Sequence, residues 1–140
     1  MCGIFGVCAL PGAGVEVHTL KTLVDKLFIL SESRGKEAAG LAVRGGDRLG
    51  VYKRPLAARE MIKEKAYARF FADFFPSDST PPTLPTAIIG HSRLTTNGLQ
   101  YISENNQPVI YDGLVAVHNG IIANEAELWQ NIPNQQRQSD

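Results

Sequence analysis

The chain has 140 residues, which is enough for one compact domain with a substantial hydrophobic core. Its 14 basic and 14 acidic residues balance and no long basic run is present, so nucleic acid is not an expected partner. No uninterrupted apolar stretch approaches the roughly 18 residues that span a bilayer, and no signal-peptide pattern is visible. With two cysteines and no disulfide framework, we expect a cytoplasmic protein with free thiols and no membrane partner.

The first half of the chain alternates between predicted strands and helices. Residues 3–9 are short, apolar and interrupted by glycine, as in a buried strand. Apolar residues recur at helical spacing over residues 19–31, and Thr19 is a candidate N-cap. Residues 40–44 and 49–53 flank a Gly-Gly-Asp turn, which predicts a hairpin.

The middle of the chain contains a predicted helix, a loop and a strand. Helix formers over residues 57–75 end in four phenylalanines, whose spacing favours a place in the core. Prolines crowd residues 76–85, where we expect an exposed loop. A further strand at residues 86–90 runs into residues 91–93.

The last third of the chain predicts a second hairpin and a short helix. Residues 109–111 and 114–118 surround an Asp-Gly dipeptide, a strong signal for a tight hairpin turn. Residues 124–132 read as a short helix that Pro133 ends. The remaining residues are polar.

Cys2 is the most informative residue of the chain, because it follows the initiator methionine and can become an N-terminal nucleophile. Aminopeptidase removal of Met1 leaves a residue that carries both a thiol and a free α-amine. An α-amine titrates near pH 7.7–8.0 and a free thiol near 8.5, so a proton can pass from sulfur to nitrogen close to neutral pH. A nucleophile with an N-terminal amine as its base is a recognised catalytic arrangement. Taken alone, Cys2 is better explained as an incidental residue near a terminus or as a small apolar residue buried in a first strand.

Three further motifs strengthen the interpretation of Cys2 as a catalytic nucleophile. The opening Cys2–Gly6 is followed in order by Ser33–Gly40, Gly90–Gly98 and His118–Ile122. This set resembles the class II glutamine amidotransferases, a family of N-terminal nucleophile hydrolases. It is most similar to the glutaminase domains of glucosamine-6-phosphate synthase and glutamine phosphoribosylpyrophosphate amidotransferase.

The resemblance implies an α+β fold, a four-layer α/β/β/α sandwich of the N-terminal nucleophile hydrolase type. Domains of this family continue through further strands and helices, so residues 1–140 are expected to be the N-terminal part of such a domain, with the fold incomplete at the C-terminus. Either the chain is a fragment of a larger protein, or it is a shortened form. The synthetase or transferase domain that uses the ammonia is also absent.

The resemblance assigns the catalytic role to three residues. The Cys2 thiolate attacks the side-chain amide carbon of glutamine, with its own α-amine as the base. Ammonia leaves, and water then hydrolyses the glutamyl thioester to glutamate. The side-chain amide of Asn119 and the backbone N–H of Gly120 are similar to the family's oxyanion hole. The Asn-Gly dipeptide taken alone is an ordinary turn.

The resemblance also implies the residues that hold glutamine. Arg93 matches the arginine that binds the α-carboxylate, and its planar fork suits bidentate capture. Thr96, Asn97 and Gly98 belong to the segment that closes over the site. Asp140 falls where the family has the acidic residue that binds the α-amine.

The other motif residues are expected to support the site. Arg34 and Gly35 position the turn beside the Cys2 strand, and Arg34 can also help to fix the active-site loops. His91 and His118 are not needed as bases, so we expect them to orient loops through hydrogen bonds. No metal or cofactor is required, and no cluster of cysteine and histidine has metal-ligand spacing.

The leading hypothesis is therefore a glutamine-hydrolysing domain whose partners are L-glutamine and an ammonia-accepting synthetase or transferase domain or subunit. A second hypothesis is a catalytically weak glutamine-binding or assembly module, since the acidic residue at the C-terminus lacks following structure. A third is a hydrolase of another amide, against which Arg93 argues because it suits an amino-acid carboxylate.

Overall fold

Four strands form one antiparallel sheet in a computed structural model that describes residues 1–75, 85–95, 99 and 101–132. The strand order is β1-β4-β2-β3, so the strand that follows Cys2 pairs with a strand more than 80 residues later in the sequence. The strands are β1 (Gly3–Ala9), β2 (Ala38–Gly45), β3 (Arg48–Arg54) and β4 (Thr86–Arg93). Gly3 pairs with Ser92, and Arg93 pairs with Ala38. This register brings Cys2 to the end of β4.

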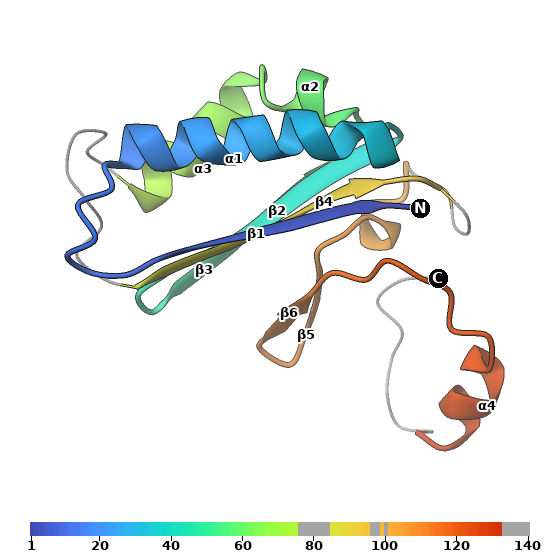
Figure 1. Ribbon diagram of the computed structural model, residues 1–140. Coiled ribbons are helices and arrows are strands. Elements are labelled where there is room, and N and C mark those ends of the chain that lie inside the picture. Colours follow the sequence, from blue (N-terminus) through green and yellow to red (C-terminus); the bar gives the residue numbers. More distant parts are fainter. Residues whose placement is uncertain (76–84, 96–98, 100, 133–140) are drawn as a thin grey trace.

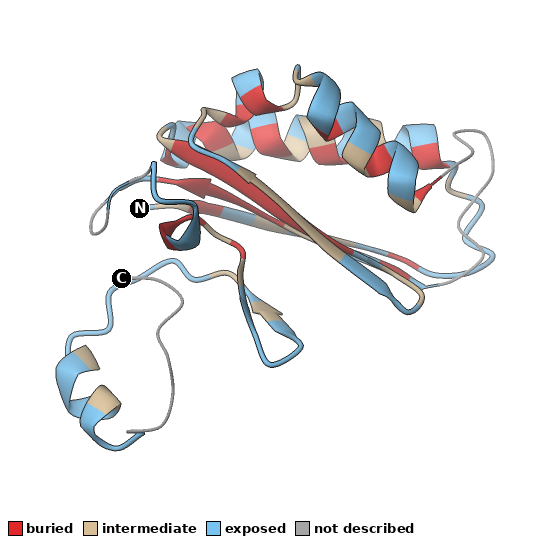
Figure 2. Ribbon diagram, turned by 180° about the vertical axis from the view of Figure 1, so that it is seen from behind, coloured by how far each residue is buried: buried red, intermediate tan, exposed pale blue. Residues whose placement is uncertain are grey.

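Helices cover one face of this sheet (Figure 1). They are α1 (Val17–Ser31), the 3-10 turn η1 (Glu32–Arg34), α2 (Ala58–Met61) and α3 (Lys65–Phe74). Their buried residues, red in Figure 2, form one core with buried residues of β2 and β4. Burial of apolar surface of this kind is the main stabilising contribution to a fold. The fully buried members of this core with the largest side chains are Tyr67, Phe28, Leu20, Leu41, Met61 and Ile88.

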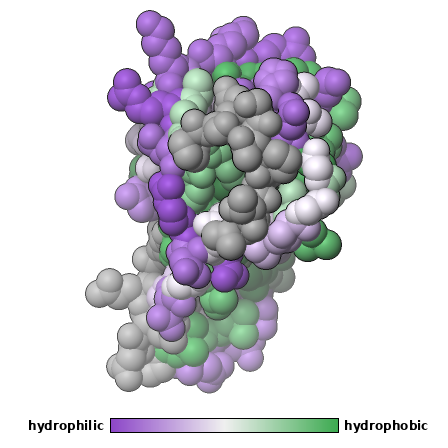
Figure 3. All heavy atoms as spheres, turned by 90° about the vertical axis from the view of Figure 1, so that its left-hand side faces the viewer, coloured by the Kyte–Doolittle hydropathy of each residue, from purple (hydrophilic) through white to green (hydrophobic). Residues whose placement is uncertain are grey.

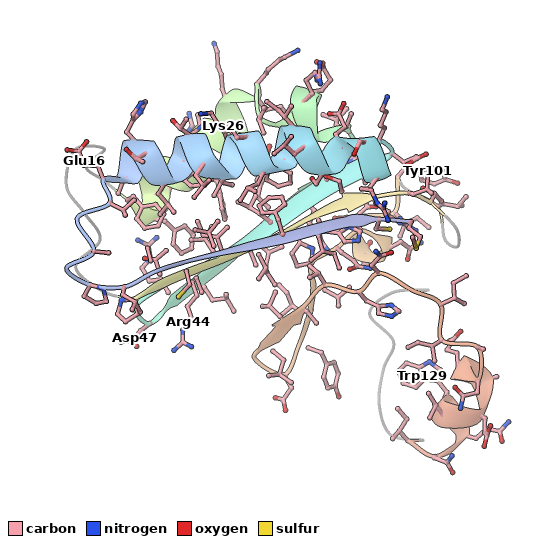
Figure 4. All side chains as sticks on the ribbon, in the orientation of Figure 1. Glu16, Lys26, Arg44, Asp47, Tyr101 and Trp129 are labelled. Atoms are coloured by element: carbon pink, nitrogen blue, oxygen red, sulfur yellow. The ribbon has the colours of Figure 1, made fainter. Side chains whose placement is uncertain are left out.

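Side chains alternate between the two faces of the sheet, as the period of a strand requires. In β2, Ala39, Leu41 and Val43 belong to the core beneath the helices. Arg44 points away from the helix layer and is exposed (Figure 4). Hydrophilic side chains cover the top of the molecule in Figure 3, where the outer surface of the helix layer lies. The helices are therefore amphipathic and screen one face of the sheet from water.

The segment after β4 lies on the other side of the sheet (Figure 1). It contains the 3-10 turn η2 (Ser103–Asn105), a two-stranded ribbon of β5 (Val109–Tyr111) and β6 (Leu114–Ala116), and α4 (Glu125–Gln130). The ribbon turns at Asp112 and Gly113, both with positive φ, as a tight hairpin turn requires. No residue of α4 is buried.

The structure confirms a strand at residues 3–9, both hairpins and the core role of Phe71 and Phe75. The strand at residues 3–9 lies at the edge of the sheet and is mostly half-buried or exposed, so the expectation that it is buried was wrong. Three predicted boundaries were wrong. The first helix begins at Val17, after an N-cap at Glu16 that uses no side chain, so Thr19 is not the cap. The helix expected over residues 57–75 is two helices, because Glu64 is extended with φ −67° and ψ 135°. The second hairpin strand ends at Ala116 rather than at residue 118.

The architecture is α+β, with mixed helices and antiparallel sheets. The described residues supply one helix layer, one four-stranded sheet and a short ribbon beyond the sheet. The complete four-layer sandwich stays a prediction. The proline-rich loop predicted at residues 76–85 lies outside the described residues except for Pro85. Within the described part of the chain, no helix is long and apolar enough to cross a membrane.

Candidate active site

Cys2 lies at the meeting point of three segments that are far apart in sequence. Its backbone nitrogen donates a hydrogen bond to Asn119 Oδ1 over 3.1 Å. Its sulfur accepts from the backbone N–H of Leu94 at 3.4 Å and lies 3.6 Å from the Leu94 carbonyl oxygen. Cys2 is half-buried, so its thiol remains accessible from solvent. The structure therefore joins the first, third and fourth motifs at Cys2, through its sulfur and its backbone nitrogen.

Gly35 explains why the turn after α1 can approach this point so closely. A Cβ atom at position 35 would lie 2.3 Å from the carbonyl carbon of Arg93 and 2.4 Å from the backbone nitrogen of Leu94. Only glycine leaves room for that backbone. Next to it, the backbone N–H of Glu37 donates to the Arg93 carbonyl at 3.2 Å. Arg34, by contrast, is exposed and lines a hollow of about 430 Å³ together with Met1 and Leu94.

Arg93 is the last residue of β4 and is buried, with 7% of its surface exposed. Its Nη1 donates a 2.8 Å hydrogen bond to Asn106 Oδ1. A buried guanidinium keeps its charge and is costly to leave without polar partners. The arrangement holds a positive charge at the same end of the sheet as the Cys2 sulfur, which suits an anionic group of a substrate.

Asn119 and Gly120 lie in a connection after β6 and are exposed. Asn119 Oδ1 faces the Cys2 backbone, so the Nδ2 end of the same amide is the donor end. The preceding residue, His118, donates its backbone N–H to Gln107 Oε1 at 2.5 Å. This hydrogen bond anchors the Asn-Gly connection to the segment below the sheet.

The expectation that the His91 and His118 imidazoles orient loops through hydrogen bonds is not supported. His91 is fully buried, and neither of its ring nitrogens has a hydrogen-bond partner within the described residues. Burial lowers the pKa of His91 to about 4. The backbone of His118 opposes this shift, whereas the nearby charges of Arg93 and of the His118 ring add to it. His91 is therefore held as a neutral packing residue. His118 contributes its backbone N–H instead of its exposed ring.

Four predicted substrate-binding residues, Thr96, Asn97, Gly98 and Asp140, lie outside the described residues. Their roles stay predictions. Across the described ranges, no group of three His, Cys, Asp or Glu side chains could hold a metal ion.

Sequence reasoning missed three partners in this site: the Leu94 backbone N–H, Asn106 and Gln107. Asn106 and Gln107 lie outside the four motifs and between the predicted strands at residues 86–90 and 109–111. Asn106 is almost completely buried, at 1% exposure, which is unusual for a polar side chain in a turn. A short asparagine-rich run carries no spacing that would reveal this, so only the tertiary structure could identify the contact.

The chain is homologous to the class II glutamine amidotransferases, which confirms the resemblance that its motifs predict. It is 32% identical over 135 residues to a glutamine–fructose-6-phosphate aminotransferase (isomerizing) of Corynebacterium glutamicum, covering 94% of this chain and 19% of that protein. It is 33% identical over 132 residues to an amidophosphoribosyltransferase of Mycobacterium leprae, covering 91% of this chain and 20% of that protein. The chain thus spans about a fifth of the length of these curated relatives. No protein-family model and no solved structure matches it.

Proposed function

We propose that this chain carries out the glutaminase half-reaction of a class II amidotransferase, with Cys2 as the nucleophile. The observation that carries the proposal is the convergence on Cys2 of Leu94 and Asn119, beside the buried Arg93. A nucleophile, amide donors and a cation for a carboxylate are the groups that an amide hydrolase for an amino-acid substrate needs. The similarity to glutamine-dependent relatives supports the same chemistry.

The first step is attack by the Cys2 sulfur on the side-chain amide carbon of glutamine. Once Met1 is removed, the Cys2 nitrogen becomes an α-amine that accepts the thiol proton directly or through a water molecule. Asn119 Oδ1 lies 3.1 Å from this nitrogen and can keep the amine in place by accepting one of its N–H groups. The Leu94 N–H, 3.4 Å from the sulfur, stabilises negative charge as the thiolate forms.

The tetrahedral intermediate places negative charge on the former carbonyl oxygen. Asn119 Nδ2 and the Gly120 backbone N–H are the donors that stabilise this oxyanion in the proposed mechanism. Collapse breaks the C–N bond, and the leaving nitrogen takes the proton from the amine and departs as ammonia. Attack by water then breaks the C–S bond, releases glutamate and restores the thiol.

Arg93 binds the α-carboxylate of glutamine in this proposal. Thr96, Asn97 and Gly98 close over the substrate, and Asp140 binds its α-amine. The ammonia passes to an acceptor domain or subunit.

The experiment that tests the proposal is intact-protein mass spectrometry before and after treatment with the glutamine analogue 6-diazo-5-oxo-norleucine. We expect loss of Met1 and a single covalent adduct on Cys2 that excess glutamine prevents. Cys8 is the control, since it is a second free thiol, exposed and on β1, the strand that follows Cys2. Cys8→Ala should keep the adduct, and Cys2→Ala should lose it.

An adduct that survives in Cys2→Ala, or hydrolysis of glutamine by that variant, would exclude the proposed nucleophile. Glutamine binding without turnover in the unmodified chain would favour the binding-module hypothesis. Release of ammonia from other amides, but not from glutamine, would favour the third hypothesis.

A further inference from the structure

Asn106 is a buried polar residue that the proposed reaction does not use. Its Oδ1 accepts a 2.8 Å hydrogen bond from Arg93 Nη1, although 12 residues separate the two along the chain. Asn106 has 1% of its surface exposed, and Arg93 has 7%. A hydrogen bond between two buried side chains fixes both in a single rotamer, because water cannot replace either partner.

The backbone around Asn106 is held by three contacts, two of which are to the sheet. Its N–H donates to the Ser103 carbonyl at 3.1 Å, and its carbonyl accepts from Lys53 Nζ at 2.7 Å. The next carbonyl, that of Gln107, lies where a Cβ on Gly40 would be only 2.2 Å away. Asn106 is therefore a fixed point from which a neighbouring side chain can be oriented.

The same short segment also holds the other half of the site. The Gln107 side chain accepts the backbone N–H of His118, which directly precedes Asn119. Residues 106 and 107 thus contact the arginine on one side and the Asn-Gly connection on the other. The distance between the Arg93 guanidinium and the Asn119-Gly120 connection therefore depends on residues 106 and 107.

An amide is chemically suited to this task. Its oxygen accepts from the guanidinium without cancelling the positive charge, whereas a carboxylate in its place would form an ion pair with the arginine. Arginine carries five N–H donors, and bidentate capture of a carboxylate uses two of them. The bond to Asn106 is therefore compatible with substrate binding by Arg93.

We infer that Asn106 is a positioning residue, which holds the Arg93 guanidinium in the orientation that captures the α-carboxylate of glutamine. This inference rests on the proposed function. It goes beyond that function by assigning substrate affinity to a residue outside the four motifs.

The test measures glutamine hydrolysis and thermal unfolding of the full chain with two substitutions at position 106. Asn106→Ala should raise the glutamine KM by about tenfold, the effect expected for losing one hydrogen bond to a charged group, with kcat little changed. In an Arg93→Ala background, the same substitution should leave KM unchanged, because the group that it positions is already absent.

Asn106→Asp separates positioning from simple structural support. Aspartate keeps the size and the acceptor oxygen, so the melting temperature should be maintained or raised, while the new ion pair competes with the substrate and KM rises. A purely structural role of Asn106 predicts that the melting temperature and the glutamine KM of Asn106→Asp both stay near the wild-type values. Tyr67→Phe is the control for general destabilisation, since it removes a buried hydrogen bond to Asp25 in the helix layer and should leave KM unchanged.

Calorimetric titration with glutamine in a Cys2→Ala background distinguishes the two ways in which the inference can fail. If Cys2→Ala does not bind glutamine and the unmodified chain does not hydrolyse it, the proposed function is wrong and the role of Asn106 falls with it. If glutamine binds to Cys2→Ala and equally well to Cys2→Ala with Asn106→Ala, the proposed function stands and the positioning role is overturned.

Discussion

At the scale of single residues, the site depends on backbone contacts that tolerate no added atoms. Gly35 has an extended conformation, with φ −175°, that any residue can adopt. Its restriction is therefore purely one of space, set by the Arg93 and Leu94 backbone. Arg93 carries the buried guanidinium of the candidate site, and the Leu94 N–H faces the Cys2 sulfur, so crowding at position 35 acts directly on that site.

Gly35→Ala is expected to lower the free energy of unfolding by about 1–3 kcal/mol, the usual cost of inserting a methyl group into packed structure. Denaturant unfolding followed by circular dichroism measures this change. Gly6→Ala is the matched control, because the nearest atom to its Cβ is 3.6 Å away, an ordinary contact. Equal stability changes in the two variants would show that the backbone beside Gly35 yields without cost.

At the scale of elements, α2 begins without a side-chain cap of its own. Ala57 occupies the N-cap position and has no polar side chain. The buried Glu32, on η1, supplies the missing acceptor, since its Oε2 accepts the Arg59 backbone N–H at 2.7 Å. The ion pair between Glu32 and the Arg59 side chain is longer, at 3.7 Å, and 59% of that arginine side chain is exposed. Screening by solvent makes the pair a small contribution.

Glu32→Ala should therefore destabilise the fold by about 1–2 kcal/mol, the range for loss of a helix N-cap. Glu32→Gln keeps an oxygen acceptor while removing the charge, so it should retain most of the stability. The midpoint of denaturant unfolding for the two variants gives the comparison. If Glu32→Gln lowers the free energy of unfolding as much as Glu32→Ala does, the charge of Glu32 rather than its cap to α2 is the stabilising feature.

The elements also show what the sequence could and could not predict. Strands and hairpin turns were predictable because alternation and Asp-Gly or Gly-Gly-Asp turns are local signals. The break between α2 and α3 was not, because Glu64 is a good helix former. Its carboxylate instead accepts hydrogen bonds from Tyr52 and Arg54 on β3, a tertiary contact with no local signature.

The candidate site divides in the same way. Cys2, Arg93 and Asn119 were predictable, because their motifs combine residue type with order along the chain. Asn106 was not predictable, because its role arises only when the segment after β4 crosses the open face of the sheet and meets Arg93.

At the scale of the whole molecule, described residues cover one end of the sheet face that lies opposite the helices. His91 pairs in register with Ile4 and Gly40 on this face and is fully buried. Cys8 and Ala87, at the other end of the same face, are exposed. The segment from η2 to Asn119 thus buries the end of the sheet that holds the site. The burial of His91 therefore depends on the packing of this segment against the sheet.

The burial of His91 makes the stability of the molecule depend on pH. Its pKa is about 4 in the folded chain against an ordinary value of 6.5, so the unfolded chain binds the proton more readily. Stability from this group is complete above pH 6.5 and is lost as the pH falls toward 4, by up to roughly 3 kcal/mol. Urea unfolding at intervals between pH 7 and pH 4 measures the slope of the free energy of unfolding against pH. His91→Gln should flatten it, even if that variant is less stable throughout, whereas His18→Gln at an exposed position of α1 should keep it. An unchanged slope in His91→Gln would mean that other groups cause the acid sensitivity, and that water reaches the ring when the segment over the sheet opens.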